Sequence, residues 1–266
     1  MSEPLPKISL VTPVFNGVRY LPETLASIRA QNYPNLEYIV CDGGSTDGTL
    51  ELLDQNRDLV KQLLVGKDRG MYDALNKGFA QGSGDLMGWI NADDQLLPWC
   101  LRSVAAYFDA TPDCEWLTGI PAVFDPEGRL AWVANVAPHY RRQWIARGWY
   151  SGLGLGVIQQ ECTFWRRGLF ERVGRLNAEL RWGGDLDLWR RFAASGADLH
   201  QVGTVLAGFR QHGSNASAKF AERYHAEGGA KRIPGGRLLG YSYSFLRFLL
   251  DRRAGRRRLR EILLPE

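Results

Sequence analysis

The sequence contains few cysteines, and none of them is spaced for a zinc site or a disulfide framework. Its 266 residues include four, Cys41, Cys100, Cys114 and Cys162, without any Cys-x-x-Cys pair. Scattered cysteines of this kind are typical of proteins in a reducing compartment. We therefore expect the chain to reside in the cytoplasm.

Long apolar runs are absent as well. No stretch approaches the ~20 apolar residues that a membrane-spanning helix requires. The first apolar run, residues 8–15, is short and interrupted by Pro13, so we expect no signal peptide. The chain also lacks a Gly-x-Gly-x-x-Gly motif after a strand, which excludes a dinucleotide-dependent oxidoreductase. Hydrophobic residues nevertheless make up 45% of the sequence, enough for one large domain with a full core.

Basic residues are concentrated near the carboxyl end. Residues 219–266 hold 12 Lys and Arg against 5 Asp and Glu, whereas the remaining chain holds 21 against 24. Apolar residues recur there at helical spacing (Leu238, Tyr241, Phe245, Leu249), before an arginine-rich end. This pattern fits a helix lying on an anionic membrane surface, and it equally fits a helix docked on its own domain. We expect no nucleic-acid partner, because the rest of the chain is acidic and has no recognition motif.

Strands and helices alternate over the first hundred residues. Apolar runs predict strands at residues 8–15, 36–41, 60–65 and 86–90. Helical spacing predicts helices at residues 21–31, near 50–53 and at 71–81. This alternation implies an α/β fold, with a mostly parallel sheet sandwiched by helices.

The second half of the chain has a looser pattern. It predicts a helix at 101–108, a hairpin at 116–132 with its turn at 125–128, irregular loop with short helices over 135–160, a helix at 185–195 and a strand at 200–210. We therefore predict a domain over residues 1–217, followed by a basic, amphipathic helical tail over 218–266.

Acidic residues follow three of the predicted strands at the points where these end. Asp42 follows the second strand, Asp68 the third, and Asp93 and Asp94 the fourth. Ligands of open α/β sheets bind at the carboxyl ends of the strands. Carboxylates that converge there repel one another unless a cation binds, and oxygen ligands suit Mg²⁺ or Mn²⁺. The pattern therefore predicts a divalent metal together with a nucleoside diphosphate.

Four segments, in this order and spacing, resemble glycosyltransferase family 2. They are Thr12–Asn16, Asp42–Thr49, Asp68–Gly78 and Asn91–Asp94, and the resemblance extends from about residue 7 to about residue 217. It implies a GT-A fold, a nucleotide-sugar donor, Mn²⁺ or Mg²⁺ as cofactor, and transfer with inversion. We expect a UDP-sugar donor and a saccharide or polyprenyl-linked acceptor. The expected setting is surface polysaccharide assembly, at the cytosolic face of the membrane.

The resemblance also assigns residues to the donor and the metal. Asp93, the last acid of Asn91-Ala92-Asp93, matches the position that holds the metal, and His212 matches a late histidine that reaches the metal or the diphosphate. Asn91 replaces an acid that is common in the family, although it can still accept a hydrogen bond from ribose. The residues expected at the donor are Thr12, Pro13, Phe15, Asp42, Asp68, Asn91 and Arg210.

The segment Trp182–Trp189 resembles the family motif that contains the general base. Asp185 matches that base, and one carboxylate opposite the leaving group is sufficient for inversion. Gly184 stands where glutamate is frequent, which is a departure from the motif. Asp187 is a weaker candidate, since two residues along a helix turn it roughly 200° away. The residues expected in the acceptor cleft are Gln160, Glu161 and Trp182.

Simpler roles are open for several of these side chains. Asp42 and Asp47 have the residue type and position to cap the following helix. Asp185 can serve as an ordinary acid at a helix amino terminus, and His212 can be structural.

Two other classes of function compete with the transferase. A nucleotidyltransferase is expected to show a Gly-x-Gly-x-x-Arg loop after the first strand, where this chain has Asn16-Gly17-Val18-Arg19. A non-catalytic sugar- or lipid-binding protein is the second alternative. Hydrolysis of the donor in solution would separate that alternative from an enzyme.

Overall fold

A seven-stranded sheet forms the centre of the molecule. The structure is a computed structural model and describes residues 5–134, 138–215, 219–246 and 249–250. The strand order is β10-β6-β9-β4-β1-β2-β3. Strand β9 runs antiparallel to β4 and β6, and the other neighbouring pairs are parallel. The strands are β1 (Ile8–Val14), β2 (Leu36–Asp42), β3 (Gln62–Val65), β4 (Leu86–Trp89), β6 (Trp116–Thr118), β9 (Thr163–Arg166) and β10 (Leu199–Gln201).

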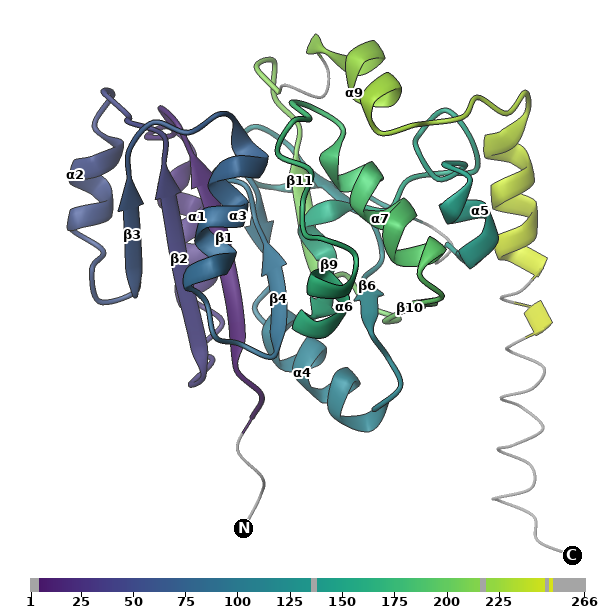
Figure 1. Cartoon of the computed structure of the whole chain (residues 1–266), viewed down its shortest axis with the longest axis horizontal. Helices are drawn as coiled ribbons and strands as arrows, with labels where there is room; N and C mark the ends of the chain where they lie inside the picture. The colour runs from purple at the N-terminus through teal and green to yellow at the C-terminus, as the bar shows by residue number, and fades with distance from the viewer. Residues whose placement is uncertain (1–4, 135–137, 216–218, 247–248, 251–266) are drawn as a thin grey trace, which may run out of the picture.

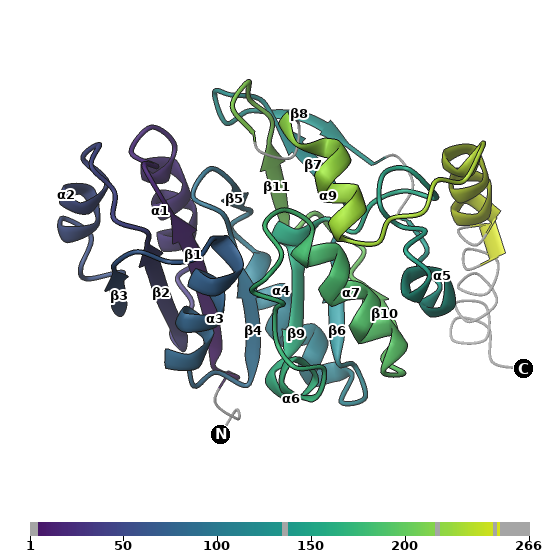
Figure 2. The same cartoon turned by 45° about the horizontal axis from the view of Figure 1, so that its top comes forward.

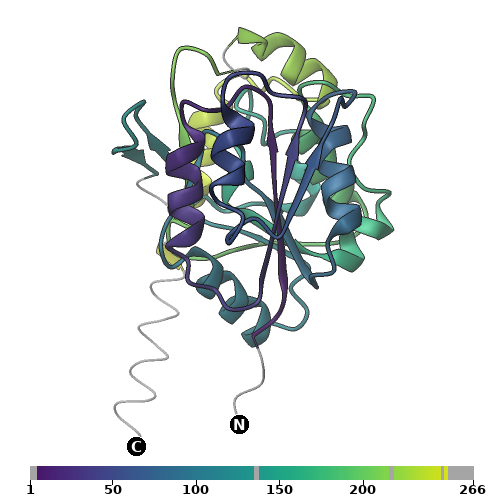
Figure 3. The ribbon, with the colours of Figure 1, turned by 90° about the vertical axis from the view of Figure 1, so that its left-hand side faces the viewer.

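Helices cover both faces of this sheet, as predicted (Figure 3). Helices α1, α2 and α4 contribute to the core on one face. Helices α3, α5, α6 and α7 contribute to the core on the other. The helices are α1 (Leu21–Arg29), α2 (Thr49–Asp54), α3 (Met71–Gln81), α4 (Cys100–Ala110), α5 (Arg142–Ala146), α6 (Arg167–Arg172), α7 (Gly184–Ala194) and α9 (Ala221–Glu227).

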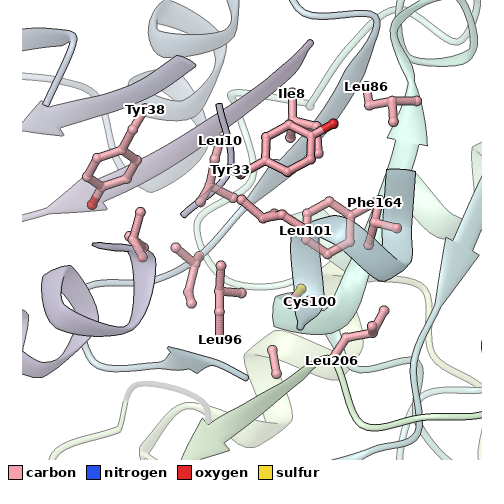
Figure 4. Packing of buried hydrophobic residues seen from close by; sticks show 14 of the residues in the cluster. Ile8, Leu10, Tyr33, Tyr38, Leu86, Leu96, Cys100, Leu101, Phe164 and Leu206 are labelled. Atoms are coloured by element: carbon pink, nitrogen blue, oxygen red, sulfur yellow. The ribbon is translucent and has the colours of Figure 1, made fainter. Parts of the chain in front are cut away.

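Side chains of the central strands alternate between the two cores. Leu10 of β1 packs with Leu101 of α4 in the first core (Figure 4), whereas the adjacent Val11 packs in the second core. Successive residues of a strand point to opposite faces, so a strand buried on both sides has a continuous apolar sequence. This explains why the uninterrupted apolar runs predicted β1, β2 and β4 correctly.

A second, smaller sheet lies beside the main sheet (Figure 2). Its strand order is β5-β11-β7-β8. It consists of β5 (Gln95–Leu96), β7 (Ala122–Phe124), β8 (Leu130–Val133) and β11 (Ala207–Arg210). The predicted hairpin over 116–132 is therefore wrong in its first part. Only β7 and β8 form it, because the fully buried β6 belongs to the main sheet instead.

Two further predictions in the second half need correction. The strand predicted over 200–210 is divided into β10 and β11, which belong to different sheets. Residues 163–172 form β9 and α6, an element pair that the sequence pattern did not predict. Both differences concern pairing with distant strands, and local hydrophobic patterns carry little information about such pairing.

The described part of the carboxyl-terminal region packs on the domain. Helix α9 lies over the amino end of α7, and a helix over residues 236–246 runs alongside α5 (Figures 1 and 2). The backbone N–H of His139 donates to Ser244, and Arg141 donates to the hydroxyl of Tyr243. The docked alternative is therefore observed for residues 236–246. Among the described residues, none of the helices has the length and apolar character needed to cross a bilayer.

Candidate active site

The predicted site residues lie along one edge of the main sheet. Strands β1 to β4 are parallel, so their carboxyl ends meet at that edge. Asp42 is the last residue of β2, and Asp68 and Asp93 follow the ends of β3 and β4. Strand β9 is antiparallel to β4. The short helix η1 (Gln160–Cys162), which immediately precedes β9, therefore reaches the same edge.

Phe15, Asp42 and Asp68 surround the loop that follows β2. Asp42 Oδ1 accepts hydrogen bonds from the N–H groups of Gly44 and Ser45, at 2.8 and 2.7 Å. Its buried Oδ2 has no hydrogen-bond partner among the described residues. A Cβ on Gly43 would lie 3.1 Å from Asp68 Oδ2 and 3.4 Å from the Phe15 ring. One oxygen of Asp42 thus orders the loop, and the second is buried without a protein partner among the described residues.

The other donor-side residues of β1 differ in their exposure. Thr12 is fully buried, and its hydroxyl accepts a hydrogen bond from Tyr38 at 3.0 Å. Pro13 is only partly buried, and Phe15 is 66% exposed. Asp47 accepts a hydrogen bond from the N–H of Thr49 at the start of α2, but the N-cap position itself is Gly48. The side chain of Thr12 therefore supports the strand from the core side, while Phe15 projects into solvent.

Asp93 and His212 form a pair at the centre of the edge. Asp93 Oδ2 lies 2.9 Å from His212 Nε2. The imidazole stacks on Tyr20, with 4.5 Å between ring centroids, and its Nδ1 lies 2.7 Å from the hydroxyl of Ser214. The Asp93 side chain keeps 29% of its surface exposed. A carboxylate oxygen and an oriented imidazole are therefore held together, and part of the Asp93 side chain is open to solvent.

This pair fits a divalent metal that also binds a diphosphate. In the described ranges no group of three or more His, Cys, Asp or Glu side chains could hold a metal ion. Mg²⁺ commonly uses one or two carboxylates and takes its other ligands from substrate phosphates and water. Mn²⁺ also accepts carboxylate oxygen, and imidazole suits several divalent transition metals. Asp93 and His212 would hold such a metal only where it replaces the hydrogen bond between Asp93 Oδ2 and His212 Nε2.

Arg210 lies beneath Asp93 and has no exposed side-chain surface. Its Nε donates to the carbonyl oxygen of Asp93 at 2.7 Å, and its other nitrogens donate to Pro126 and to Glu23. The backbone N–H of Arg210 donates to Asp94 Oδ1 at 2.8 Å. Arg210 therefore fixes the backbone that carries Asp93. A direct contact with a phosphate would require the surrounding segment to move.

Asn91 connects the ends of β4 and β9. Its amide nitrogen donates to Asp94 Oδ2 and to Gln160 Oε1, at 3.0 and 3.2 Å, and Gln160 in turn donates to the carbonyl oxygen of Trp89. A carboxylate cannot donate such bonds, which gives a physical reason for asparagine at a position where the family commonly has an acid. Asn91 Oδ1 is buried and unpaired within the described part of the chain.

Asp185, in the first turn of α7, is a buried carboxyl group with one satisfied oxygen. Tyr224 of α9 donates to its Oδ2 at 2.6 Å. Its Oδ1 is buried and meets no hydrogen-bond partner in the residues that the structure describes. Burial raises the pKa of Asp185 to about 6, against the opposing effect of the Tyr224 hydrogen bond. At neutral pH the side chain is therefore an ionised base poised to accept a proton.

Tyr72 explains why glycine precedes Asp185. A Cβ on Gly184 would lie 2.6 Å from two carbons of the Tyr72 ring. The ring is held in place because its hydroxyl donates to the carbonyl oxygen of Trp182 at 2.6 Å. In this chain, Tyr72 occupies the space that a glutamate side chain would need. Asp187, the weaker candidate, accepts a hydrogen bond from Arg191 at 2.8 Å.

Glu161 and Trp182 lie near Asp185. Burial, together with the negative charges of Asp185 and Asp93, raises the pKa of Glu161 to about 8. Glu161 is therefore mostly protonated at neutral pH. The Trp182 ring stacks on Phe220, with 4.1 Å between centroids.

Four residues that hold the site in place were not identified from the sequence: Tyr20, Glu23, Tyr72 as a spacer, and Tyr224. Tyr20 and Glu23 lie at the start of α1, beside the resembling segments. Tyr224 lies in the segment predicted as tail, 39 residues after Asp185. No sequence signal connects it with the base.

Comparison with known proteins identifies relatives over most of the chain. Residues 9–174 match the family model described as Glycosyl transferase family 2. The PGL/p-HBAD biosynthesis glycosyltransferase of Mycobacterium tuberculosis is 26% identical over 240 residues, which cover 88% of this chain and 87% of that protein. The putative glycosyltransferase EpsE of Bacillus subtilis is 28% identical over 196 residues, which cover 72% and 68%.

Solved structures confirm the predicted GT-A fold. TarS of S. aureus in complex with UDP-GlcNAc aligns with a TM-score of 0.63 and 18% identity, covering 80% of this chain and 60% of that one. The mannosyltransferase PcManGT of Pyrobaculum calidifontis, in complex with GDP-Man and Mn²⁺, aligns with a TM-score of 0.62 and 19% identity, covering 91% and 70%. The chain thus spans less than two thirds of the TarS chain.

Proposed function

Because the chain belongs to glycosyltransferase family 2, we propose that it transfers a sugar from a UDP-sugar to an acceptor hydroxyl, with inversion at the anomeric carbon. The proposed setting is surface polysaccharide or glycolipid assembly at the cytosolic face of a membrane. Two similar structures contain the donors UDP-GlcNAc and GDP-Man, and one relative is named for PGL/p-HBAD biosynthesis.

One observation carries this proposal. Asp185 is a buried carboxyl group whose Oδ1 has no protein partner among the described residues, and its pKa of about 6 leaves it ionised at neutral pH. Leaving a buried acceptor unsatisfied costs roughly 1–3 kcal/mol, so a ligand that donates a hydrogen bond is expected there. An acceptor hydroxyl meets this requirement and loses its proton to Asp185 as it attacks the donor.

The donor side uses the loops after β1, β2 and β3. Phe15 offers an exposed ring to the base, and Asp42 and Asp68 offer carboxylate oxygens to the polar edges of the base and ribose. Asn91 Oδ1 remains as an acceptor for a ribose hydroxyl.

Asp93 and His212 would hold Mn²⁺ or Mg²⁺ together with the diphosphate, while Tyr20 orients the imidazole. When bound, the metal neutralises the charge that develops on the leaving diphosphate. Arg210 is assigned a supporting role, since its hydrogen bond to the Asp93 carbonyl fixes the carboxylate that faces the metal.

On the acceptor side, Glu161 and Trp182 accompany the base. With its pKa near 8, Glu161 is a neutral hydrogen-bond partner for the acceptor and adds little repulsion to the ionised Asp185. Gln160 fixes η1 against β4. We assign the half-buried ring of Trp182 to contact with the acceptor sugar.

A thermal-shift panel of nucleoside diphosphates and nucleotide sugars, with and without Mn²⁺, tests the proposal. A ligand at a hundredfold excess over its dissociation constant stabilises the fold by roughly 2.7 kcal/mol. We expect UDP and one UDP-sugar to raise the melting temperature only when Mn²⁺ is present. Stabilisation by guanosine nucleotides alone would overturn the UDP assignment. The absence of any nucleotide effect would overturn the function.

A further inference from the structure

A separate cleft of about 890 Å³ lies beyond the proposed acceptor side, between α5, α7 and the helix over residues 236–246. Its walls are largely apolar and include Trp144, Trp149, Leu155, Leu239 and Tyr243. This volume is in the range of clefts that bind small organic ligands. The proposed nucleotide site uses none of these residues.

Four cations surround the apolar walls: Arg147, Arg190, Lys231 and Arg232. As far as the described chain extends, no acidic residue lines the cleft, and none of the four cations forms an ion pair. The Arg147 guanidinium lies over the Trp149 ring, 5.5 Å from its centroid. Cations without an acidic partner, beside an apolar wall, are complementary to a ligand that has both an apolar chain and a phosphate group.

The cleft is connected to Asp185 by two segments. Arg190 lies five residues after Asp185 on α7, about 7.5 Å along the helix axis and about 140° around it. Helix α9, which carries Tyr224, ends at Glu227. The chain then passes through Gly228 to Lys231, which lines the cleft. Gly228 packs closely on Leu186 of α7. A ligand anchored at the cations therefore lies against the same helix as the proposed base, but on a different face of it.

We propose that this cleft binds the lipid anchor of the acceptor, a long apolar chain joined through phosphate or diphosphate to the sugar that receives the transfer. The apolar chain lies against the tryptophans and Leu239, the phosphates contact Lys231, Arg232 and Arg190, and the attached saccharide extends around α7 toward Asp185. This assignment rests on the proposed transferase function and specifies its acceptor as an anionic amphiphile.

Calorimetry of ligand binding to the full-length protein, in the absence of Mn²⁺, tests this assignment. The probes are farnesyl diphosphate below its aggregation concentration, farnesol, inorganic diphosphate and phosphatidylglycerol vesicles. We expect saturable binding of farnesyl diphosphate, at least tenfold tighter than either farnesol or inorganic diphosphate. Asp93→Ala should leave this binding unchanged, which separates the cleft from the proposed metal and diphosphate site.

Two pairs of variants locate the binding site. Leu239→Asp, which alters the wall, should weaken farnesyl diphosphate binding at least tenfold, whereas Leu238→Asp should not. Both leucines are exposed on one helix, but only Leu239 lines the cleft. Lys231→Glu/Arg232→Glu should weaken binding similarly. Arg57→Glu/Lys61→Glu makes the same charge change at the opposite end of the molecule, near α2 and β3 (Figure 1), and should have no effect.

The outcomes separate the cleft from the proposed function. If UDP binds with Mn²⁺ but farnesyl diphosphate does not bind, the lipid-anchor assignment is overturned and the transferase proposal stands. If only vesicles bind, and Leu238→Asp weakens this as much as Leu239→Asp, the surface contacts a bilayer and the assignment is again overturned. If farnesyl diphosphate binds as expected but no nucleotide binds, the cleft stands as a binding site and the transferase proposal fails.

Discussion

At the scale of single residues, the buried carboxyl group of Asp185 provides the sharpest test of the proposed chemistry. Asp185→Asn keeps the shape of the side chain but cannot accept a proton from the acceptor. We expect donor affinity to be preserved and transfer to fall ~10²–10⁴-fold, the usual contribution of a general base. The measurement is single-turnover transfer beside calorimetric binding of UDP with Mn²⁺.

The alternative role of Asp185 as an ordinary helix acid makes the opposite prediction. Asparagine caps helices about as well as aspartate, so a purely structural Asp185 would allow nearly normal turnover in the variant. That result would make Glu161 or Asp187 the candidate general base instead. Circular dichroism and melting temperature must first establish that the variant is folded.

Tyr224 gives a pH-dependent test of the same group. Asp185 must be ionised to act as a base, so kcat/KM should fall below an apparent pKa of about 6. The Tyr224 hydrogen bond stabilises the carboxylate and lowers this pKa. In Tyr224→Phe, the acidic limb should therefore move to higher pH, while activity on the alkaline side of the limb is largely kept. An unmoved limb would mean that another group controls it.

Asp93 is the residue on which metal-dependent binding should depend. Asp93→Ala removes the carboxylate and leaves the backbone carbonyl that accepts from Arg210, so the fold should persist. We expect Mn²⁺-dependent affinity for UDP to fall at least tenfold by calorimetry. Asp113→Ala, which removes an exposed acid elsewhere, is the control. Equal affinities in the two variants would exclude Asp93 from the metal site.

The sequence predicted many of the residues at the carboxyl edge of the main sheet, but not the tertiary contacts that fix their side chains. Parallel strands gather their carboxyl ends by geometry, so the neighbourhood of Asp42, Asp68 and Asp93 could be predicted from the strand pattern. The bond between Tyr224 and Asp185 joins two helices 39 residues apart. Such contacts arise from tertiary packing and leave no periodic pattern in the sequence.

At the scale of helices and strands, Gly184 shows how packing restricts a motif. A Cβ there would lie 2.6 Å from the Tyr72 ring, so Gly184→Ala should destabilise the fold by about 1–3 kcal/mol through overpacking. Gly168→Ala in α6 meets no atom within 4 Å in the described structure and should stabilise by up to ~1 kcal/mol, since alanine favours helices. Urea unfolding of both variants measures the difference.

A double-mutant cycle tests the cause of that destabilisation. Tyr72→Ala creates space beside residue 184, so Gly184→Ala should cost less in that background than in the native protein. An unchanged cost would show that the Tyr72 ring is not responsible.

Helices and strands could be predicted where a local sequence pattern determines them, and not where distant pairing does. Helices α1 and α3 and strands β1, β2 and β4 follow from apolar periodicity. The divided strand over 200–210 and the missed strand β9 did not follow, because their identities depend on which distant strand pairs with them. These errors fall where the main sheet meets the smaller one.

At the scale of the whole molecule, Glu161 should make stability depend on pH in the absence of ligand. Burial raises its pKa from 4.5 to about 8, so between these values the folded state binds more protons than the unfolded state. The free energy of unfolding should therefore fall as the pH rises toward 8. Glu161→Gln stays neutral and should flatten this slope between pH 6 and 8, measured by urea unfolding. The exposed Glu171→Gln should keep the slope; equal slopes in the two variants would contradict the burial argument.

The overall α/β class followed from strand–helix alternation, which is a property of the whole chain. The pattern of residues 236–246 was ambiguous from sequence, because an apolar stripe suits both a membrane and a protein surface. The structure shows the docked contacts of Tyr243 and Ser244 and leaves Leu238 and Leu239 exposed. The packing of this helix against residues 139–144 and 154–155 distinguishes its covered side from its exposed side.

The hydrogen bond from Tyr224 to Asp185 also bears on the order in which parts of the site form during synthesis. The ribosome makes the chain from its amino end, and domains begin to fold from there during synthesis. Asp42, Asp68 and Asp93 therefore emerge long before Tyr224, which completes the environment of the base. A growing chain can assemble its nucleotide loops while Asp185 still lacks its hydroxyl partner. The surroundings of Asp185 are thus completed only after the segments that carry Asp42, Asp68 and Asp93 have been made.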